Sequence, residues 1–128
     1  MRTFIKCDFH IHSSSDFSRT YSESDFLDAL ESSGLDCVAI TDHNGIDLDL
    51  YKRAKARLDS KGIGLLAGVE LNLKLSQTTI GEYGLYVATK PSKRYFHAIV
   101  LASIDDIEQL SNKVDKLFIG GCGQKVGP

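Results

Sequence analysis

The four histidines of this 128-residue chain all stand in or next to short apolar runs that read as β-strands. His10 and His12 form an H-x-H pair that closes the first of these runs. Side chains at positions i and i+2 of an extended segment point the same way, so both imidazoles can bind one metal ion. We therefore predict a metal site that begins with this pair.

Four further candidate ligands follow along the chain. Asp16 stands in a serine-rich loop after the H-x-H pair, His43 ends the second predicted strand, Glu70 lies in the third and His97 in the fourth. Imidazoles mixed with carboxylates suit Zn, Mn or Fe better than they suit Ca²⁺. Because a carboxylate such as Glu70 can bridge two ions, we expect two or three divalent ions close together.

Each of these residues alone has a plainer interpretation. Glu70 alternates with Asn72 and Lys74, as a solvated strand face would. His97 fits an ordinary histidine near a sheet edge, and Asp16 fits an Asx-turn. The joint placement favours the metal site, because random placement would scatter four histidines over helices and loops.

Two acids and three basic residues accompany the candidate ligands. Asp8 and Asp42 each stand close before a candidate ligand histidine and could orient its ring, although a turn or strand-end role is equally expected. Arg19, Lys93 and Arg94 are candidate phosphate-binding residues. For these three, a solvated surface position is the favoured interpretation, because short charged runs are usually surface.

The elements that must position these residues alternate between strand and helix. We predict strands over 3–10, 37–41, 65–75 and 95–102, a helix that Ser22 caps and Gly34 ends, a second over about 47–60, and a third after Ser103. Residues 77–93 read as an excursion with a short strand over 83–88. The alternation implies an α/β fold with a parallel sheet, in which the carboxyl ends of the strands carry the chemistry.

Composition narrows the class of protein. Hydrophobic residues make up 42%, charged residues 25%, and the net charge is -2, which fits one globular domain and excludes a disordered chain or a strongly basic binder of duplex nucleic acid. With no apolar run of about 20 residues and no signal peptide, we expect a cytoplasmic protein without a membrane partner. Cys7, Cys37 and Cys122 form no C-x-x-C pair and suit a reducing compartment, and we expect Cys7 and Cys37 to be buried.

The ordered set DFHIHSSSD, AITDHN, GVELN and FHAIVLA resembles the PHP family, the polymerase and histidinol phosphatase domain. The resemblance covers roughly residues 5–103 and is strongest to PHP modules that precede P-loop ATPase regions in larger bacterial proteins. It implies a distorted β/α barrel, of parallel β/α units, with a multinuclear metal site at the carboxyl ends of its strands. It also implies hydrolysis of phosphomonoesters, or of phosphodiesters in nucleic acids, by attack of a metal-bound hydroxide on phosphorus.

The resemblance also implies individual roles. The H-x-H pair would bind one ion, which Glu70 bridges to a second ion held by His97. A third ion would be held by His43, with help from Asp16. The residues with catalytic roles would be His10, His12, Glu70 and His97.

The later metal-binding motifs of the family have no counterpart, since no histidine follows His97. We therefore expect residues 1–128 to be a single PHP-like domain, truncated on its C-terminal side, that forms the front part of the barrel. Four main strands cannot close a barrel, so we expect completion by a C-terminal segment, an ATPase domain or self-association. The chain alone is expected to show weak or absent activity.

The predicted function is that of a metal-dependent phosphoesterase, a phosphatase or a nuclease, acting on a phosphorylated small molecule or on nucleic acid. One alternative is a non-catalytic metal-binding module, because the ligand set of the family is incomplete. The other is an amidohydrolase-type metal hydrolase that cleaves C–N bonds, against which the T-D-H motif argues.

Overall fold

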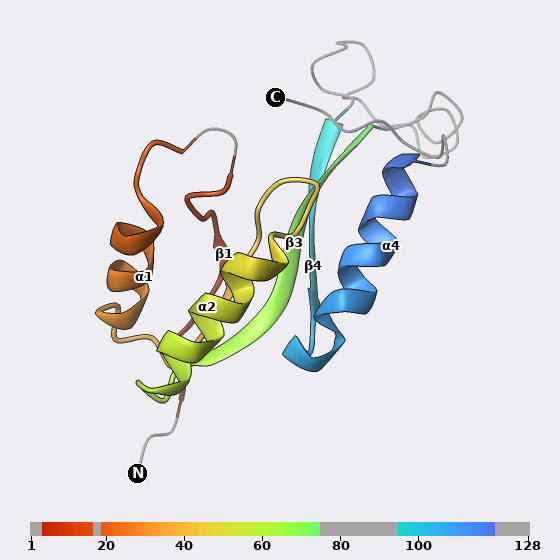
Figure 1. The fold of residues 1–128 in the computed structure, drawn as a ribbon. Helices are drawn as coiled ribbons and strands as arrows, with labels where there is room; N and C mark the ends of the chain where they lie inside the picture. Colours follow the sequence, from red (N-terminus) through yellow and green to blue (C-terminus); the bar gives the residue numbers. More distant parts are fainter. Residues whose placement is uncertain (1–3, 17–18, 75–94, 120–128) are drawn as a thin grey trace.

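The computed structural model describes residues 4–16, 19–74 and 95–119. Its elements are β1 (Cys7–Ile11), α1 (Glu23–Glu31), β2 (Cys37–Ile40), α2 (Leu48–Asp59), β3 (Gly64–Lys74), β4 (Tyr95–Ala102), the 3₁₀ turn η3 (Ile104–Asp106) and α4 (Ile107–Ile119) (Figure 1). The predicted strand over 83–88 lies outside the described residues, as do Lys93, Arg94 and Cys122. Within the described part of the chain, no helix is long and apolar enough to span a bilayer.

The first two helices begin at the residues that the sequence indicates. The Ser22 side chain accepts a hydrogen bond from the backbone N–H of Asp25 at 3.1 Å, which satisfies one of the free donors at the start of α1. The Asp47 carboxylate does the same for the N–H of Leu50 at 3.0 Å at the start of α2. Each helix is followed by a glycine with positive φ, and the chain then turns back toward the sheet.

The sheet has the strand order β1-β2-β3-β4, and β1, β2 and β3 are parallel. Helices α1 and α2 are the crossovers between these strands, as the alternation predicts. Their apolar side chains pack with Val38 and Ile40 of β2 into one core, and Val114 of α4 packs against Val69 and Leu71 of β3 in a second. All three helices therefore cover one face of a curled sheet (Figure 1).

Strand β4 runs antiparallel to β3, whereas the sequence alternation predicted a parallel strand here. Lys74 pairs with Tyr95 and Ala67 pairs with Ala102, so the chain leaves β3 and enters β4 at the same end of the sheet. A parallel crossover needs a connecting element, usually a helix, that returns the chain to the other end. The sequence between β3 and β4 carries no helical periodicity, and without such an element the strand returns beside its predecessor.

The helix-free face of the sheet has a different composition at its two ends. Because side chains alternate along a strand, Glu70 and Asn72 of β3 point away from the core residues that alternate with them. The register places Ile99 and Leu101 of β4 on this same face, where they are 38% and 39% exposed. On the helix-free face, polar groups thus lie toward the carboxyl end of β3, and exposed apolar groups lie toward its amino end.

Candidate metal centre

All six predicted ligands meet where β1, β2 and β3 end and β4 begins. Among the described residues, they form three overlapping groups whose possible ligand atoms lie within 4.8 Å of one another. The groups are His10 with His12 and Glu70, His43 with Glu70 and His97, and His12 with Asp16 and His43. The fold thus brings together side chains that are up to 87 residues apart in the sequence, as the difference between His10 and His97 shows.

Glu70 lies at the centre of this cluster and is only 1% exposed. Its Oε1 is 3.3 Å from Nε2 of His10 and 2.7 Å from Nδ1 of His97. Its Oε2 is 2.9 Å from Nε2 of His43 and 3.1 Å from Nε2 of His12. The plainer interpretation of Glu70 as a solvated strand residue is therefore wrong, because its carboxylate is buried among four imidazoles.

The segment after β2 fixes the backbone of Glu70. The Glu70 N–H donates to the carbonyl of Asp42 at 3.0 Å, and the Asn44 N–H donates to the carbonyl of Glu70 at 2.8 Å. The Asn44 side chain then accepts from the N–H of Asn72 at 2.8 Å. Asn44 has a φ of 57°, a left-handed conformation that asparagine tolerates better than most residues. His43, between these anchors, consequently faces Glu70.

A tyrosine from α2 fills the gap where β2 and β3 separate. The regular β2–β3 ladder ends with Ile40 opposite Ala67 and resumes at Glu70. In between, the Tyr51 hydroxyl donates to the carbonyl of Ile40 and accepts from the N–H of Gly68 at 2.9 Å. Burial raises the pKa of Tyr51, so the hydroxyl keeps the proton that it donates. This residue was missed at the sequence level, because its helical spacing marks it only as a core residue.

A bulge near the end of β1 re-aims the first histidine. Asp8 is opposite Val38 and Ile11 is opposite Ile40, so β1 contains one more residue than β2 between these two pairs. The Asp8 carboxylate accepts a hydrogen bond from the backbone N–H of His10 at 3.0 Å. The contact that the structure shows for Asp8 is thus with the backbone of a ligand residue, and it stabilises the irregular strand end.

The loop after β1 is held by a buried acid. Asp42 accepts hydrogen bonds from the N–H of Ser13 at 2.7 Å and from the Ser13 hydroxyl. Burial raises the pKa of Asp42, although the bonds from Ser13 oppose the shift. Thr41 accepts from the N–H of Ile11 at 3.1 Å and continues this connection between the two strand ends. Asp42 therefore positions the loop that carries His12, and Ser13 was missed because only tertiary contact assigns it a partner.

Asp16 lies in the third ligand group and is 4% exposed. It accepts from the backbone N–H of His43 at 3.1 Å, and its oxygens lie 3.0 and 3.1 Å from Nδ1 of the same residue. Burial alone would raise the pKa of Asp16, but the hydrogen bonds from His43 outweigh it and lower the pKa. Arg19 is the predicted phosphate-binding residue that the structure describes, and its Nε lies 3.8 Å from Asp16.

The donor chemistry of the cluster fits divalent metal ions. Burial lowers the pKa of His12, which favours the neutral imidazole that metals bind. Burial would raise the pKa of Glu70, but the surrounding histidines lower it and favour the carboxylate. The buried atoms Nδ1 of His12 and Oε2 of Glu70 have no hydrogen-bond partner. Ligand atoms about 2.0–2.2 Å from one ion lie roughly 3.0–3.5 Å apart. The distances from Glu70 to His10 and His12, 3.3 and 3.1 Å, fall in this range, and those to His43 and His97, 2.9 and 2.7 Å, are shorter.

One residue beside the cluster was not assigned from the sequence. Asn72 stands two positions after Glu70 and opposite His97 in the register, and its buried Oδ1 has no hydrogen-bond partner. The signal was present in the motif GVELN, but an asparagine on an alternating strand face is typical of solvent exposure. The structure places it instead on the face that carries the ligands.

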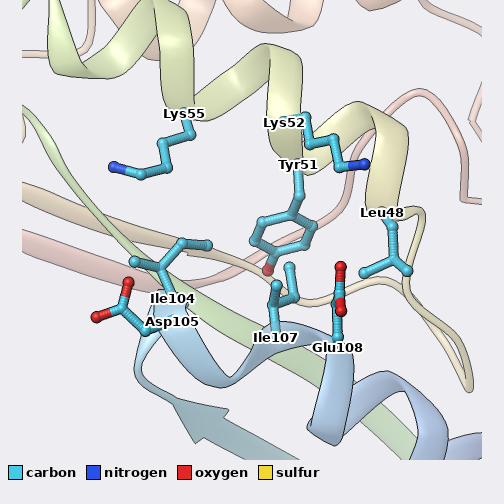
Figure 2. Close-up of a pocket in the computed structure, with 8 residues that line it drawn as sticks. All are labelled: Leu48, Tyr51, Lys52, Lys55, Ile104, Asp105, Ile107 and Glu108. Atoms are coloured by element: carbon cyan, nitrogen blue, oxygen red, sulfur yellow. The ribbon is translucent and has the colours of Figure 1, made fainter.

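Two cavities lie near or behind the cluster. One of about 310 Å³ adjoins the third ligand group and is lined by Ser15, Asp16, Asp42, His43, Gly45, Ile46 and Asp47. The other, of about 110 Å³, lies between α2 and the start of α4 (Figure 2). It is lined by Leu48, Tyr51, Lys52, Lys55, Ile104, Asp105, Ile107 and Glu108, none of which belongs to the three ligand groups.

Comparison with known proteins places this geometry in a known fold. No protein-family model and no curated protein matches the chain. The structure is similar to an amidohydrolase from Chromobacterium violaceum, described with bound sulfate and no metal, with 18% sequence identity and a TM-score of 0.59 over 90% of this chain and 34% of that chain. At this level of sequence identity, the likeness shows a shared fold over about one third of that protein.

A second similar structure is a two-domain protein from Bacteroides vulgatus, described as containing a predicted PHP-like metal-dependent phosphoesterase. Its sequence identity is 17% and its TM-score 0.46, over 87% of this chain and 33% of that chain. The chain therefore spans about one third of the length of each of these two proteins. The partial barrel expected from the sequence is confirmed, with β4 reversed relative to the expectation.

Proposed function

We propose that the chain supplies the metal-binding part of a metal-dependent phosphoesterase. The observation that carries the proposal is the position of Glu70, whose two oxygens each lie within 3.3 Å of two imidazole nitrogens. A buried carboxylate surrounded in this way could be shared by two adjacent ions. Zn, Mn or Fe is the expected metal, in two or three copies, because the ligands are imidazoles and carboxylates.

Some residues of the cluster would bind the ions, and others would orient the side chains that bind them. His10, His12, His43 and His97 offer imidazole nitrogens from the ends of β1 and β2 and from the start of β4. Asp16 holds Nδ1 of His43, which leaves Nε2 facing the Glu70 carboxylate. A carboxylate behind a ligand histidine fixes the ring and its tautomer. When bound, the metal ions would activate a water and neutralise charge on the oxygens of a phosphoryl group.

We favour a phosphoester over an amide. Ions held by adjacent ligand groups that share one carboxylate would, when bound, neutralise charge on the oxygens of a phosphoryl group. Arg19 beside Asp16 adds a positive charge at the edge of the cluster, where a further phosphate oxygen could be bound. The similarity to an amidohydrolase keeps C–N hydrolysis as the second candidate.

The test uses Glu70→Gln, which keeps the size of the side chain and removes its charge. Metal content and hydrolysis of chromogenic phosphomonoesters, phosphodiesters and amides are measured with Mn²⁺, Zn²⁺ or Fe²⁺. We expect weak, metal-dependent phosphoester hydrolysis by the parent chain, and a loss of metal affinity and activity of at least ~10-fold in the variant. The matched control is Glu23→Gln, an exposed carboxylate on α1 that pairs with Arg53 outside the cluster.

The outcomes separate the candidate functions. Hydrolysis of amides without hydrolysis of phosphoesters would assign the chain to the amidohydrolase type. A chain that binds metal through Glu70 and hydrolyses none of the substrates would be a non-catalytic metal-binding module. Equal metal content in Glu70→Gln and in the parent would contradict the bridging role itself.

A further inference from the structure

Two cysteines lie at the opposite end of the strands from the histidine cluster. Cys7 begins β1 and Cys37 begins β2, and their Cα atoms are partners in the parallel ladder. Both are free thiols, and Cys7 is exposed while Cys37 is half-buried. The expectation that both are buried core residues is therefore wrong for Cys7, whose strand lies at the edge of the sheet, and holds only in part for Cys37.

The two thiols share the helix-free face. Val38 and Ile40 are buried beneath the helices, and side chains alternate along a strand, so Cys37 points to the other face. Cys7, as its direct partner in the neighbouring parallel strand, projects from the same face. Burial raises the pKa of the Cys37 thiol, and the nearby Cys7 thiol raises it further.

Space is left open beside the sulfur atoms. Cys37 is paired with Cys7 on one side and with Gly64 of β3 on the other. A Cβ atom at Gly64 would lie 3.2 Å from Sγ of Cys37, so the glycine keeps this space open. Neighbouring strands are about 4.8 Å apart, and two metal–sulfur bonds of about 2.3 Å span roughly that separation.

We propose that Cys7 and Cys37 form a dithiolate site for one soft, thiophilic ion, such as Cu⁺, Cd²⁺, Hg²⁺ or trivalent arsenic. Thiolates select soft ions, whereas imidazoles and carboxylates select borderline ones, so the two ends of the sheet bind different metals. Each thiol releases one proton and forms one bond to the ion, without any change in oxidation state. The site ties the first residues of β1 to β2, three positions before His10.

The test uses phenylarsine oxide, which condenses with two neighbouring thiols, forms two arsenic–sulfur bonds and releases one water. Cys122→Ser serves as the parent, because it leaves only the two strand cysteines. Under a phosphine reductant, we expect intact mass spectrometry to show one arsenical per chain. The adduct should survive a wash with a monothiol and be released by a dithiol.

Single variants decide the assignment. In the Cys122→Ser background, Cys7→Ser and Cys37→Ser should each lose the adduct in the monothiol wash, while the remaining thiol still reacts with iodoacetamide. Retention of the adduct by either single variant would overturn the proposal. So would failure of the parent to hold the arsenical although both of its thiols are alkylated.

A second measurement separates this site from the histidine cluster. Cd²⁺ bound by thiolates gives an ultraviolet charge-transfer band that imidazole and carboxylate ligands do not give. We expect the band in the Cys122→Ser parent and in its His10→Ala, His12→Ala derivative, and its loss in Cys37→Ser. A band that disappears with the histidines and persists without Cys37 would contradict the dithiolate site.

Discussion

The histidine cluster and the pocket between α2 and α4 both carry charged side chains, but they hold them in opposite ways. In the pocket, Lys52 and Lys55 stand on the α2 side, and Glu108 stands with Ile104 and Ile107 on the opposite side (Figure 2). These charged groups are exposed, so water solvates them at little cost. Lys55, for example, already pairs with the exposed carboxylate of Asp59 on its own helix at 2.8 Å.

In the cluster, the charged carboxylate of Glu70 is buried, and its partner side chains lie around it. Glu70 is 1% exposed and lies within 3.3 Å of four histidines. Burial of a carboxylate with an oxygen that lacks a hydrogen bond costs free energy, which bound metal ions would recover. Buried ligand atoms that lie close together thus indicate a chemical site here, whereas an apolar pocket with exposed charged residues at its rim is typical of packing between helices.

The largest expected effect comes from removing the H-x-H pair. We expect His10→Ala with His12→Ala to lose tightly bound metal, because two of the three ligand groups lose a member or more. Metal per chain is measured by elemental analysis after dialysis. The matched double variant Lys52→Ala with Lys55→Ala, in the pocket, should keep the parental metal content. Equal metal content in both double variants would abolish the distinction between the two regions.

A second prediction concerns the helix-free face on which the cluster lies. We expect the 128-residue chain to self-associate there, because Ile99 and Leu101 are exposed apolar residues of an edge strand. Leu101→Lys should lower the mass measured by light scattering toward that of a monomer. Leu117→Lys makes the same change at an exposed leucine on α4 and should leave the mass unchanged. A parent chain that is already monomeric would contradict this prediction.

Tyr51 connects the pocket to the strands that carry the cluster. Its ring lines the pocket, and its hydroxyl bonds to β2 and β3 (Figure 2). Tyr51→Phe leaves the buried carbonyl of Ile40 and the N–H of Gly68 without this partner. We expect a loss of about 1–3 kcal/mol in the free energy of unfolding, measured by urea denaturation. Metal affinity should also fall, because the strand that presents Glu70 is less well fixed. If affinity stays at the parental value, the ladder alone positions Glu70.

The smallest effect is expected from trimming the pocket itself. Ile107→Val removes one methylene from a partly buried side chain and should cost no more than about 1 kcal/mol in the free energy of unfolding. Metal content and phosphoester hydrolysis should not change. A change in either would mean that the pocket is coupled to the cluster, contrary to the comparison above.

Much of the local structure follows from short-range rules that the sequence displays. The caps at Ser22 and Asp47 set the beginnings of α1 and α2, because the capping bonds reach only three residues along the chain. The apolar run of β2 and the alternating pattern of β3 likewise need no distant partner to be recognised. The four histidines could be named for the same reason, since each stands at or near a recognisable strand end. Glu70 lies inside β3 and Asp16 in the loop after β1, and they were named from their residue type and their place in the order.

Other features depend on contacts that no local pattern shows. The extra residue in β1 exists only relative to the register of β2, and the left-handed turn at Asn44 is stabilised by bonds to β3. The burial of Glu70 is a further case, because an alternating strand face looks the same whether water or four histidines cover it. These features link residues about 26 to 60 positions apart, beyond the reach of periodicity.

The sequence by itself determined which residues could bind metal and which strands carry them. Only the tertiary structure decided that they meet, and the direction of β4 is the reason. His97 is the third residue of β4, so in a parallel strand it would lie at the amino end of the sheet, away from Glu70. In the antiparallel strand it stands opposite Asn72, with Nδ1 2.7 Å from Glu70. Strand direction depends on pairing and on the path of the connecting chain, and neither is written in the side-chain pattern of the strand.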